Sequence, residues 1–389
     1  MIYLDHHATT PVDARVLEVM LPYFTERFGN AASKQHAFGW AANDAVERAR
    51  KQVAALVGAG SKDVVFTSGA TEANNLAIKG AAEARRGERD HLVTIVTEHQ
   101  AVLDPMRRLE RDGWRLTVLP VGGSGLVDLS ELERAITART ALVSVMAANN
   151  EIGVLQPIRE AAALAHAQGA WFHTDAVQAV GKVPFDVEAL DVDLASLTAH
   201  KLYGPKGAGA LYVRRPSTLL GAGNRGVKLA AQVDGGGHER GMRSGTLNVP
   251  GIVGFGQAAD LARVEMASEA GRMTGLRDRL LAGLRAKTDG MSVNGAMDAR
   301  LPGNLNVSFD DVDAEAIMLA CREIAVSSGS ACTSASLEPS HVLKAIGLSS
   351  VRAHGSIRFG LGRRTTADEI ERTITAFATA IPTLRAMNP

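Results

Sequence analysis

Side chains able to act as nucleophile, acid or base directly follow several predicted strands. Asp175 ends the run FHTD, His99 closes VTEH, and Lys201 follows LASLTAH. A lysine amine forms an imine with a carbonyl compound, a carboxylate keeps a neighbouring ring nitrogen protonated, and an imidazole exchanges protons near neutral pH. Because ligands of parallel α/β sheets bind beyond the carboxyl ends of the strands, we expect these groups to meet at one site.

A further group lies in FTSGATEANN, where the turn Ser68–Thr71 joins a strand to a helix. The free N–H groups of a helix N-terminus, together with hydroxyls, bind phosphate. Pyridoxal phosphate needs an amine for its resting Schiff base, a carboxylate for its pyridine nitrogen and donors for its phosphate. Lys201, Asp175 and this turn supply all three. The combination predicts a pyridoxal-phosphate site, with His99 stacked on the ring as an acid and base.

Each of these residues also has a purely structural interpretation. Asp175 and the Ser68–Thr71 turn would serve equally well as helix caps, and His99 as a structural histidine. Lys206, in the turn GPKG, competes with Lys201 for the Schiff-base role. We favour Lys201, because it directly follows a strand end, whereas the turn around Lys206 is expected to face solvent. The prediction depends on the joint placement of these residues.

Known sequence motifs for nucleotide and metal binding are either absent or lack the flanking elements that they require. Gly221, Gly223 and Gly226 form a GxGxxG pattern, but the preceding PSTLL is not a clear strand and no acidic residue follows at the required distance. No GxxxxGK[ST], CxxC or HExxH pattern occurs, and the 11 histidines are scattered. We therefore do not expect a catalytic metal centre.

The two cysteines stand in contrasting contexts. Cys332 lies in SSGSACTSASLEPS, among small residues that favour a mobile, exposed loop. Cys321 lies in the apolar helical run AIMLACREI and is interpreted as a buried small hydrophobe. Burial suits Cys332 poorly, because no apolar periodicity surrounds it.

Short strands and helices alternate to position these groups. Strands are predicted at 63–67, 91–96, 114–119, 141–146, 170–174, 194–198 and 209–213, with helices at 70–86, 102–111, 129–138 and 158–167. Apolar strands between helices indicate an α/β fold whose mainly parallel sheet is covered on both faces.

After about Pro250 the pattern changes to a smaller α+β arrangement. Helices are predicted at 251–269 and 272–287, strands at 304–309 and 356–359, and a final helix at 367–380. A chain of 389 residues is too long for one ordinary core, so we expect two domains.

The composition is that of an ordinary globular protein. The 42 basic residues balance the 42 acidic ones, so no global field favours nucleic acid or an anionic membrane. The first residues lack the basic and apolar regions of a secretory signal, and no apolar run approaches the length of a membrane span. With only two cysteines, the reducing cytoplasm is the expected location.

Four runs, FHTDAVQ, AHKLYGPKG, GGGHERGMRSGT and SSGSACTSASLEPS, resemble those of the group I cysteine desulfurases of the NifS/IscS type. The resemblance extends from YLDHHATTPVD to GSIRFGLGR and covers nearly the whole chain. It implies the type I pyridoxal-phosphate fold, like that of aspartate aminotransferase, and a homodimer. A large cofactor-binding domain is expected at 13–255, and a small domain, formed by 1–12 and 256–389, is expected to carry the Cys332 loop.

The resemblance also implies the residues that hold the cofactor. Lys201 carries it, Asp175 pairs with the pyridinium nitrogen, and His99 stacks on the ring. Gln178 and Asn150 contact the phenolic oxygen. The remaining contacts, mainly to the phosphate, come from Ala70, Thr71, Thr198 and His200, with Thr246 reaching in from the partner subunit.

The implied reaction takes sulfur from L-cysteine and leaves L-alanine. Arg358, in GSIRFGLGR, pairs with the substrate carboxylate, and Asn150 also contacts the substrate. The amine of Lys201 removes the α-proton, and the thiolate of Cys332 attacks the substrate sulfur, with His99 as its partner. Cys332 then holds a persulfide for acceptor proteins in iron–sulfur cluster, thio-cofactor or tRNA biosynthesis, and through it becomes a transient iron–sulfur ligand.

Several alternatives stay open. Another type I pyridoxal enzyme, such as an aminotransferase or a selenocysteine lyase, would keep Lys201 and Asp175; an aminotransferase would not need the thiol of Cys332. A non-catalytic sulfur carrier or scaffold would use Cys332 without a cofactor. The sulfur acceptor is also open among nitrogenase maturation, general iron–sulfur assembly and tRNA thiolation. Docking to an ISC-type scaffold is open as well, because the chain stops at AIPTLRAMNP, whereas IscS-like members continue into a tail that engages their scaffold. At this end the chain resembles NifS-like members.

Overall fold

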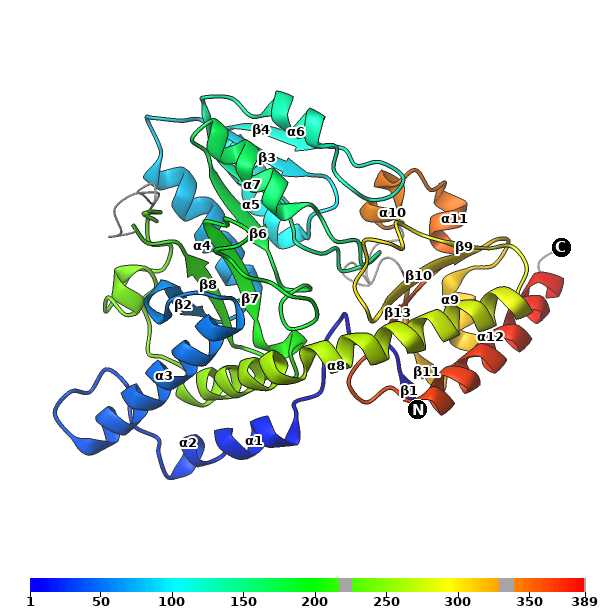
Figure 1. Cartoon of the computed structure of the whole chain (residues 1–389), viewed down its shortest axis with the longest axis horizontal. Helices are drawn as coiled ribbons and strands as arrows, with labels where there is room; N and C mark the ends of the chain where they lie inside the picture. Colours follow the sequence, from blue (N-terminus) through cyan, green and yellow to red (C-terminus); the bar gives the residue numbers. More distant parts are fainter. Residues whose placement is uncertain (217–225, 329–338, 388–389) are drawn as a thin grey trace.

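The computed structural model describes residues 1–216, 226–328 and 339–387, and its main feature is a seven-stranded sheet (Figure 1). The strand order is β2-β8-β7-β6-β5-β3-β4. Strands from β7 to β4 run parallel, whereas β8 is antiparallel to both β2 and β7. The predicted mainly parallel sheet is therefore confirmed. Its strands are β2 (Val64–Thr67), β3 (His91–Ile95), β4 (Arg115–Leu119), β5 (Thr140–Ser144), β6 (Trp171–Asp175), β7 (Leu194–Thr198) and β8 (Gly209–Val213).

Helices cover both faces of the sheet, because its strands carry apolar side chains on both sides. In the edge strand β2, for example, Val65 packs in a cluster with α4 (Ala70–Ala84) and α5 (Gln100–Arg111), whereas Val64 and Phe66 pack in a second cluster with α3 (Ala37–Leu56) and α8 (Val249–Lys287). This alternation follows from the two-residue period of a strand. The helices and turns of this part are α1 (Ala14–Met20), α2 (Pro22–Thr25), α3 (Ala37–Leu56), η1 (Ser61–Asp63), α4 (Ala70–Ala84), α5 (Gln100–Arg111), α6 (Leu129–Ala135), α7 (Ile158–Ala167), η2 (Ala199–Lys201) and η3 (Glu239–Gly241).

A smaller antiparallel sheet forms the second part of the molecule, at the right of Figure 1. Its order is β12-β13-β10-β9, and a two-stranded parallel sheet joins the N-terminal β1 to β11 beside it. Its core includes Leu305, Phe309, Phe359 and Phe377. The elements are β1 (Ile2–Tyr3), β9 (Met291–Val293), β10 (Asn304–Phe309), α9 (Ala314–Ala320), β11 (Ile324–Ala325), β12 (Ser327–Ser328), α10 (His341–Ala345), α11 (Ser350–His354), β13 (Ser356–Gly360) and α12 (Ala367–Met387).

One long helix, α8 (Val249–Lys287), connects the two parts (Figure 1). The sequence predicted two helices here, at 251–269 and 272–287, and this prediction is wrong. The first half packs Phe255 and Ala258 into the core of the large sheet, and the second half packs Leu280 and Leu284 into the core of the small sheet. Few side chains are buried between these halves, so the apolar period lapses there although the backbone stays helical.

The final helix also differs from its predicted end. We expected it to stop at 380, but α12 continues to Met387 and contains Pro382. Ile381 is fully buried and Leu384 packs against the same core. This burial explains why the helix extends beyond the predicted boundary despite the proline.

Candidate active site

A cavity of about 590 Å³ lies where the carboxyl ends of β2, β6 and β7 meet, a volume typical of sites for small organic ligands. The structure brings most of the predicted site residues to it. Thr246 is not among its lining residues, and its side chain is exposed. The rival lysine, Lys206, borders the cavity with an exposed side chain. The predicted residues that line it are Ala70, Thr71, His99, Asn150, Asp175, Gln178, Thr198, His200, Lys201 and Arg358.

Lys201 is positioned by the turn η2, which follows β7. Its Nζ donates hydrogen bonds to the backbone carbonyls of His7 and Ala8, the latter at 2.6 Å. Both carbonyls belong to the N-terminal segment, which the sequence analysis did not connect with this site. The segment lines the cavity and fixes the amine at its wall.

Asp175, the last residue of β6, is buried at the cavity with both carboxylate oxygens engaged. Oδ2 accepts from Nδ2 of Asn74 in α4 (2.7 Å), and Oδ1 accepts from the backbone N–H of Val177 (3.1 Å). These bonds tie the end of β6 to the first turns of α4. The carboxylate is thereby held in a fixed orientation.

A second buried carboxyl, that of Glu98, lies close to Asp175. Glu98 is completely buried, and its Oε1 accepts from the backbone N–H of Met146 (2.6 Å). Within the described part of the chain, its Oε2 has no hydrogen-bond partner. Burial, together with the negative charge of Asp175, raises the pKa of Glu98 well above its usual range. Glu98 therefore keeps its proton to a higher pH than an ordinary glutamate.

The N-terminus of α4 borders the cavity without a side-chain cap, which leaves backbone N–H groups of its first turn available. In the preceding turn, the N–H and hydroxyl of Ser68 both donate to Oε2 of Glu72 (2.8 and 2.5 Å). Arg243 binds the same carboxylate, with Nε 2.7 Å from Oε1. The arginine balances the negative charge of Glu72 beside a position suited to an anion.

Two imidazoles border the cavity. His99 caps α5, and its Nδ1 accepts from the backbone N–H of Ala101 (3.0 Å). Burial, and then the positive charges of Lys201 and other lysines, lower the pKa of His200 to about 4. His200 is therefore neutral at pH 7, with Nδ1 3.1 Å from the hydroxyl of Thr9.

Arg358 reaches the cavity from β13 of the small sheet. Its side chain is buried, and it donates to Oδ1 of Asp5 (2.7 Å) and to the backbone carbonyl of Asn150 (2.9 Å). Its Nε has no hydrogen-bond partner among the described residues. Because a guanidinium carries five N–H donors, Arg358 retains donors for a further anion.

His7, for which no role was expected from the sequence, also lines the cavity. Its Nδ1 is 3.1 Å from Oε1 of Gln178, an oxygen that also accepts from Nζ of Lys182 (2.7 Å). Burial, and then the positive charges of Lys182 and Arg358, lower the pKa of His7 well below its usual range. No spacing in YLDHHATTPVD could have indicated this, because each contact joins residues far apart in the chain.

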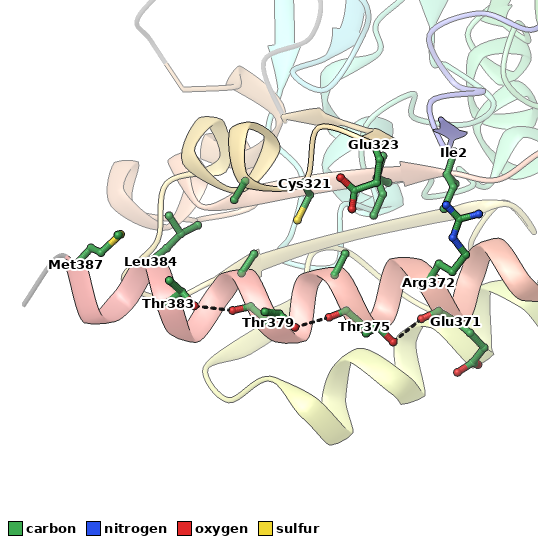
Figure 2. A pocket seen from close by; sticks show the side chains of 14 residues that line it. Ile2, Cys321, Glu323, Glu371, Arg372, Thr375, Thr379, Thr383, Leu384 and Met387 are labelled. Atoms are coloured by element: carbon green, nitrogen blue, oxygen red, sulfur yellow. Dashed lines mark hydrogen bonds between the residues drawn. The ribbon is translucent and has the colours of Figure 1, made fainter.

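A larger cavity, of about 830 Å³, lies between α12 and the α9–β11 region (Figure 2). The hydroxyls of Thr375, Thr379 and Thr383 donate to carbonyls one turn earlier in α12, as the dashed lines show. Cys321 is buried as predicted, and burial raises the pKa of its thiol to about 11. The groups at this cavity are therefore not arranged for catalysis, despite its size.

Cys332 falls within 329–338, outside the described residues, and its predicted roles as nucleophile and transient iron–sulfur ligand stay predictions. In the described parts of the chain, no group of three or more His, Cys, Asp or Glu side chains is arranged to hold a metal ion. These parts also contain no helix with the length and hydropathy needed to span a membrane.

The groups around the first cavity fit pyridoxal phosphate. A lysine amine and a buried carboxylate lie on its walls, and an uncapped helix N-terminus offers donors for a phosphate. Asn74, which fixes the carboxylate of Asp175, would keep it in place against a pyridine nitrogen. The donor set therefore matches the three chemical requirements of the cofactor.

Comparison with known proteins agrees with this geometry. The family model for class-V aminotransferases matches residues 2–373. The cysteine desulfurase IscS of Anaeromyxobacter dehalogenans is 58% identical over 388 residues, 100% of this chain and 94% of the relative, and that of Rickettsia rickettsii is 50% identical, covering 100% and 93%. A solved NifS-like protein superposes with a TM-score of 0.90 at 37% identity, covering 98% of this chain and 100% of the other. A structure of SspA in complex with cysteine gives a TM-score of 0.81 at 36% identity, covering 93% and 99%. The predicted fold is thus confirmed, and the chain belongs to the class-V aminotransferase family, among its cysteine desulfurases.

Proposed function

We propose that this protein is a pyridoxal-phosphate-dependent cysteine desulfurase, which converts L-cysteine to L-alanine and holds the released sulfur as a persulfide on Cys332. The observation that carries the proposal is the single cavity that combines Lys201, Asp175, His99 and Arg358. The full-length similarity to cysteine desulfurases supports it.

The chain offers a matching group for each part of the cofactor. Lys201 would hold it through its amine, Asp175 would meet the pyridine nitrogen, and Gln178 with Asn150 would face the phenolic oxygen. The phosphate would bind at the N-terminus of α4, near Thr71 and the other predicted phosphate ligands. When bound, the cofactor supplies an electron sink for the bond to the substrate α-hydrogen.

Arg358 is suited to select an amino-acid substrate by its carboxylate. Its guanidinium is buried, held by Asp5 and the carbonyl of Asn150, and still has donors available. A preorganised arginine binds a carboxylate with little loss of conformational entropy. This contact would place the α-carbon of L-cysteine near the amine of Lys201, which removes the α-proton.

The sulfur-transfer step requires a second thiol. The thiolate of Cys332 attacks the sulfur of the bound cysteine, a sulfur–sulfur bond forms, and the carbon–sulfur bond breaks. The electron pair stays with the three-carbon fragment, which takes up protons and leaves as alanine. Atoms and electrons balance without an added oxidant or reductant. His99 is the base that we assign to the proton of Cys332.

The assembly and the pathway are also part of the proposal. We assign the active form to a homodimer in which Thr246 reaches the phosphate of the partner subunit, consistent with its exposed position. The low cysteine content supports a cytoplasmic location. The sulfur would pass to acceptor proteins of iron–sulfur cluster or thio-cofactor and tRNA biosynthesis.

The test compares the purified, cofactor-loaded protein with Cys332→Ala and Lys201→Ala variants. L-cysteine should change the visible absorbance of the parent and of Cys332→Ala, but only the parent should release alanine and form a persulfide. Lys201→Ala should lack both responses. Alanine release by Cys332→Ala at the parent's rate would disprove the assigned nucleophile. Protein that binds no cofactor would favour the sulfur-carrier alternative.

A further inference from the structure

The residues that follow segment 329–338 contact the two turns that supply His99 and Asn150 to the cavity. Ser340 donates from its hydroxyl to Oε2 of Glu151 (2.5 Å), and Glu151 directly follows Asn150. His341 donates from Nε2 to the backbone carbonyl of Glu98 (3.1 Å), which directly precedes His99. Ser340 and Glu151 are both buried. The chain is thus held against the cavity wall immediately after the segment that carries Cys332.

The residues before segment 329–338 lie at the same site. Strand β12 (Ser327–Ser328) pairs with β13, and Ser327 stands opposite Arg358. Arg358 lines the cavity. The described residue Ser327 therefore lies next to the arginine that we assign to the substrate carboxylate, whereas Ser340 and His341 contact the turns of Asn150 and His99.

Glu151 is held rigidly by its own backbone. Its carbonyl accepts from the side-chain amides of Asn304 and Asn306 in β10, both at 3.1 Å, and its N–H donates to Oδ1 of Asn149 (2.8 Å). These contacts fix Glu151 relative to the small sheet. The carboxyl that Ser340 meets is therefore a fixed point.

Ser340 links Glu151 to the N-terminus of α10. Its hydroxyl oxygen accepts from the backbone N–H groups of Val342 (3.1 Å) and Leu343 (3.2 Å), so it caps the helix while its proton goes to Glu151. Val342 and Leu343 are buried in the core of the large sheet. The same serine thus orients the short helix and joins it to the turn at Asn150.

We propose that Glu151 and Ser340 form an anchor that positions the Cys332 segment for sulfur transfer, with the contact from His341 to Glu98 as its second point. Glu151 is a positioning residue, because it acts through Ser340 and not on the substrate. This inference rests on the proposed function. Nucleophilic attack depends on the placement of the thiol within about an ångström, whereas we assign the binding of L-cysteine to Arg358, which keeps its contacts with Asp5 and Asn150. Loss of the anchor should therefore slow persulfide formation and spare substrate binding.

The experiment uses the full-length, cofactor-loaded protein with Ser340→Ala and a matched control, Ser349→Ala. Ser349 caps α11 by accepting from the N–H of Arg352 (3.3 Å), so the control also loses a helix cap. Two quantities are measured: the L-cysteine concentration that half-saturates the absorbance change, and the single-turnover rate of persulfide formation on Cys332. Both are measured above the pKa of Glu151, which is about 7, so that its carboxyl is ionised. Ser340→Ala should then slow persulfide formation about tenfold, the effect of losing a hydrogen bond to a carboxylate, with half-saturation unchanged. Ser349→Ala should change neither quantity, and Ser340→Thr should restore the rate.

Variants of Glu151 remove the other partner of the same contact. They keep the proposal testable even if Ser340→Ala does not fold. Glu151→Ala should slow persulfide formation about tenfold, whereas Glu151→Gln keeps an oxygen that accepts from Ser340 and should slow it less. Equal slowing by Ser340→Ala and Ser349→Ala, or parent rates in Ser340→Ala and Glu151→Ala, would overturn the anchor. A parent protein whose absorbance does not respond to L-cysteine would instead overturn the proposed function, and this inference with it.

Discussion

Two buried carboxyls, those of Glu98 and Glu151, neighbour in sequence the residues that we assign to catalysis and binding. Glu98 precedes His99, and Glu151 follows Asn150. Burial raises the pKa of both carboxyls, to about 7 for Glu151. At the scale of single residues, the site therefore buries two carboxyls that would be ionised in water. Their burial lowers the stability of the folded protein.

The pH dependence of stability should reveal the cost at Glu151. Burial raises its pKa by more than the hydrogen bond from Ser340 and the positive charges of Arg358 and His99 lower it. In the unfolded chain the carboxyl ionises near its usual value of 4.5, whereas the folded protein keeps the proton until about pH 7. The free energy of unfolding should therefore fall as pH rises from about 4.5 to 7, by up to about 3 kcal/mol, and then level off.

The variant Glu151→Gln carries no titrating group and should lose this part of the profile. Its Tm relative to the parent should rise between pH 5 and pH 7 and stay constant from pH 8 upward. Calorimetry or circular dichroism at these pH values would measure it. A Tm difference that is the same at every pH would contradict the raised pKa.

At the scale of elements, the strand ends were predictable and the contacts between distant segments were not. Asp175, His99 and Lys201 could be placed because each follows an apolar strand, and the edge of a parallel sheet collects such residues. The roles of His7 and Asp5 could not, because the N-terminal segment has no regular pattern and is held at the site by β1 and by contacts with residues far along the chain, such as Lys201, Gln178 and Arg358.

The approach of β8 to the turn before α4 is a second such contact. A Cβ on Gly209 would lie 2.6 Å from Cα of Gly69, closer than atoms can approach, so glycine lets the two backbones meet. Gly209→Ala should displace the turn at the N-terminus of α4 and weaken retention of pyridoxal phosphate about tenfold or more, because the backbone donors move away from the phosphate.

Gly271→Ala, within α8, provides the control for this variant. A Cβ at Gly271 meets no neighbouring atom, so the change should stabilise the helix by about 0.5–1 kcal/mol and leave cofactor retention unchanged. Dialysis followed by absorbance measures retention, and thermal melting measures stability. Full cofactor retention in Gly209→Ala would show that the turn tolerates the displacement.

At the scale of the molecule, the division into a domain of 13–255 and one of 1–12 with 256–389 stays a prediction. The packing supports this division, since Leu4 and Phe309 belong to the core of the small sheet, whereas Phe66 and Phe255 belong to one of the two clusters on the faces of the large sheet. The core of the large sheet also includes Val342, however, from the region assigned to the small domain. The apolar patterns of the strands predict each sheet and its core. They do not show where a segment of one region packs against the other.

The predicted homodimer can be tested by whether Thr246 acts on its own cavity or on that of the partner. Thr246 is exposed and lies outside the cavity of its own chain, whereas Lys201 lines it. In Thr246→Asp, the added charge should repel the phosphate, and Lys201→Ala removes the amine, so each variant alone should be inactive.

If Thr246 acts across the interface, a hybrid dimer of the two variants has both defects in one cavity and none in the other. Equal mixing with free exchange of subunits should then restore about a quarter of the parent activity, since half of the dimers are hybrids with one intact cavity each. If Thr246 acts within its own chain, every cavity in the mixture carries one defect, and activity should stay at the level of the separate variants.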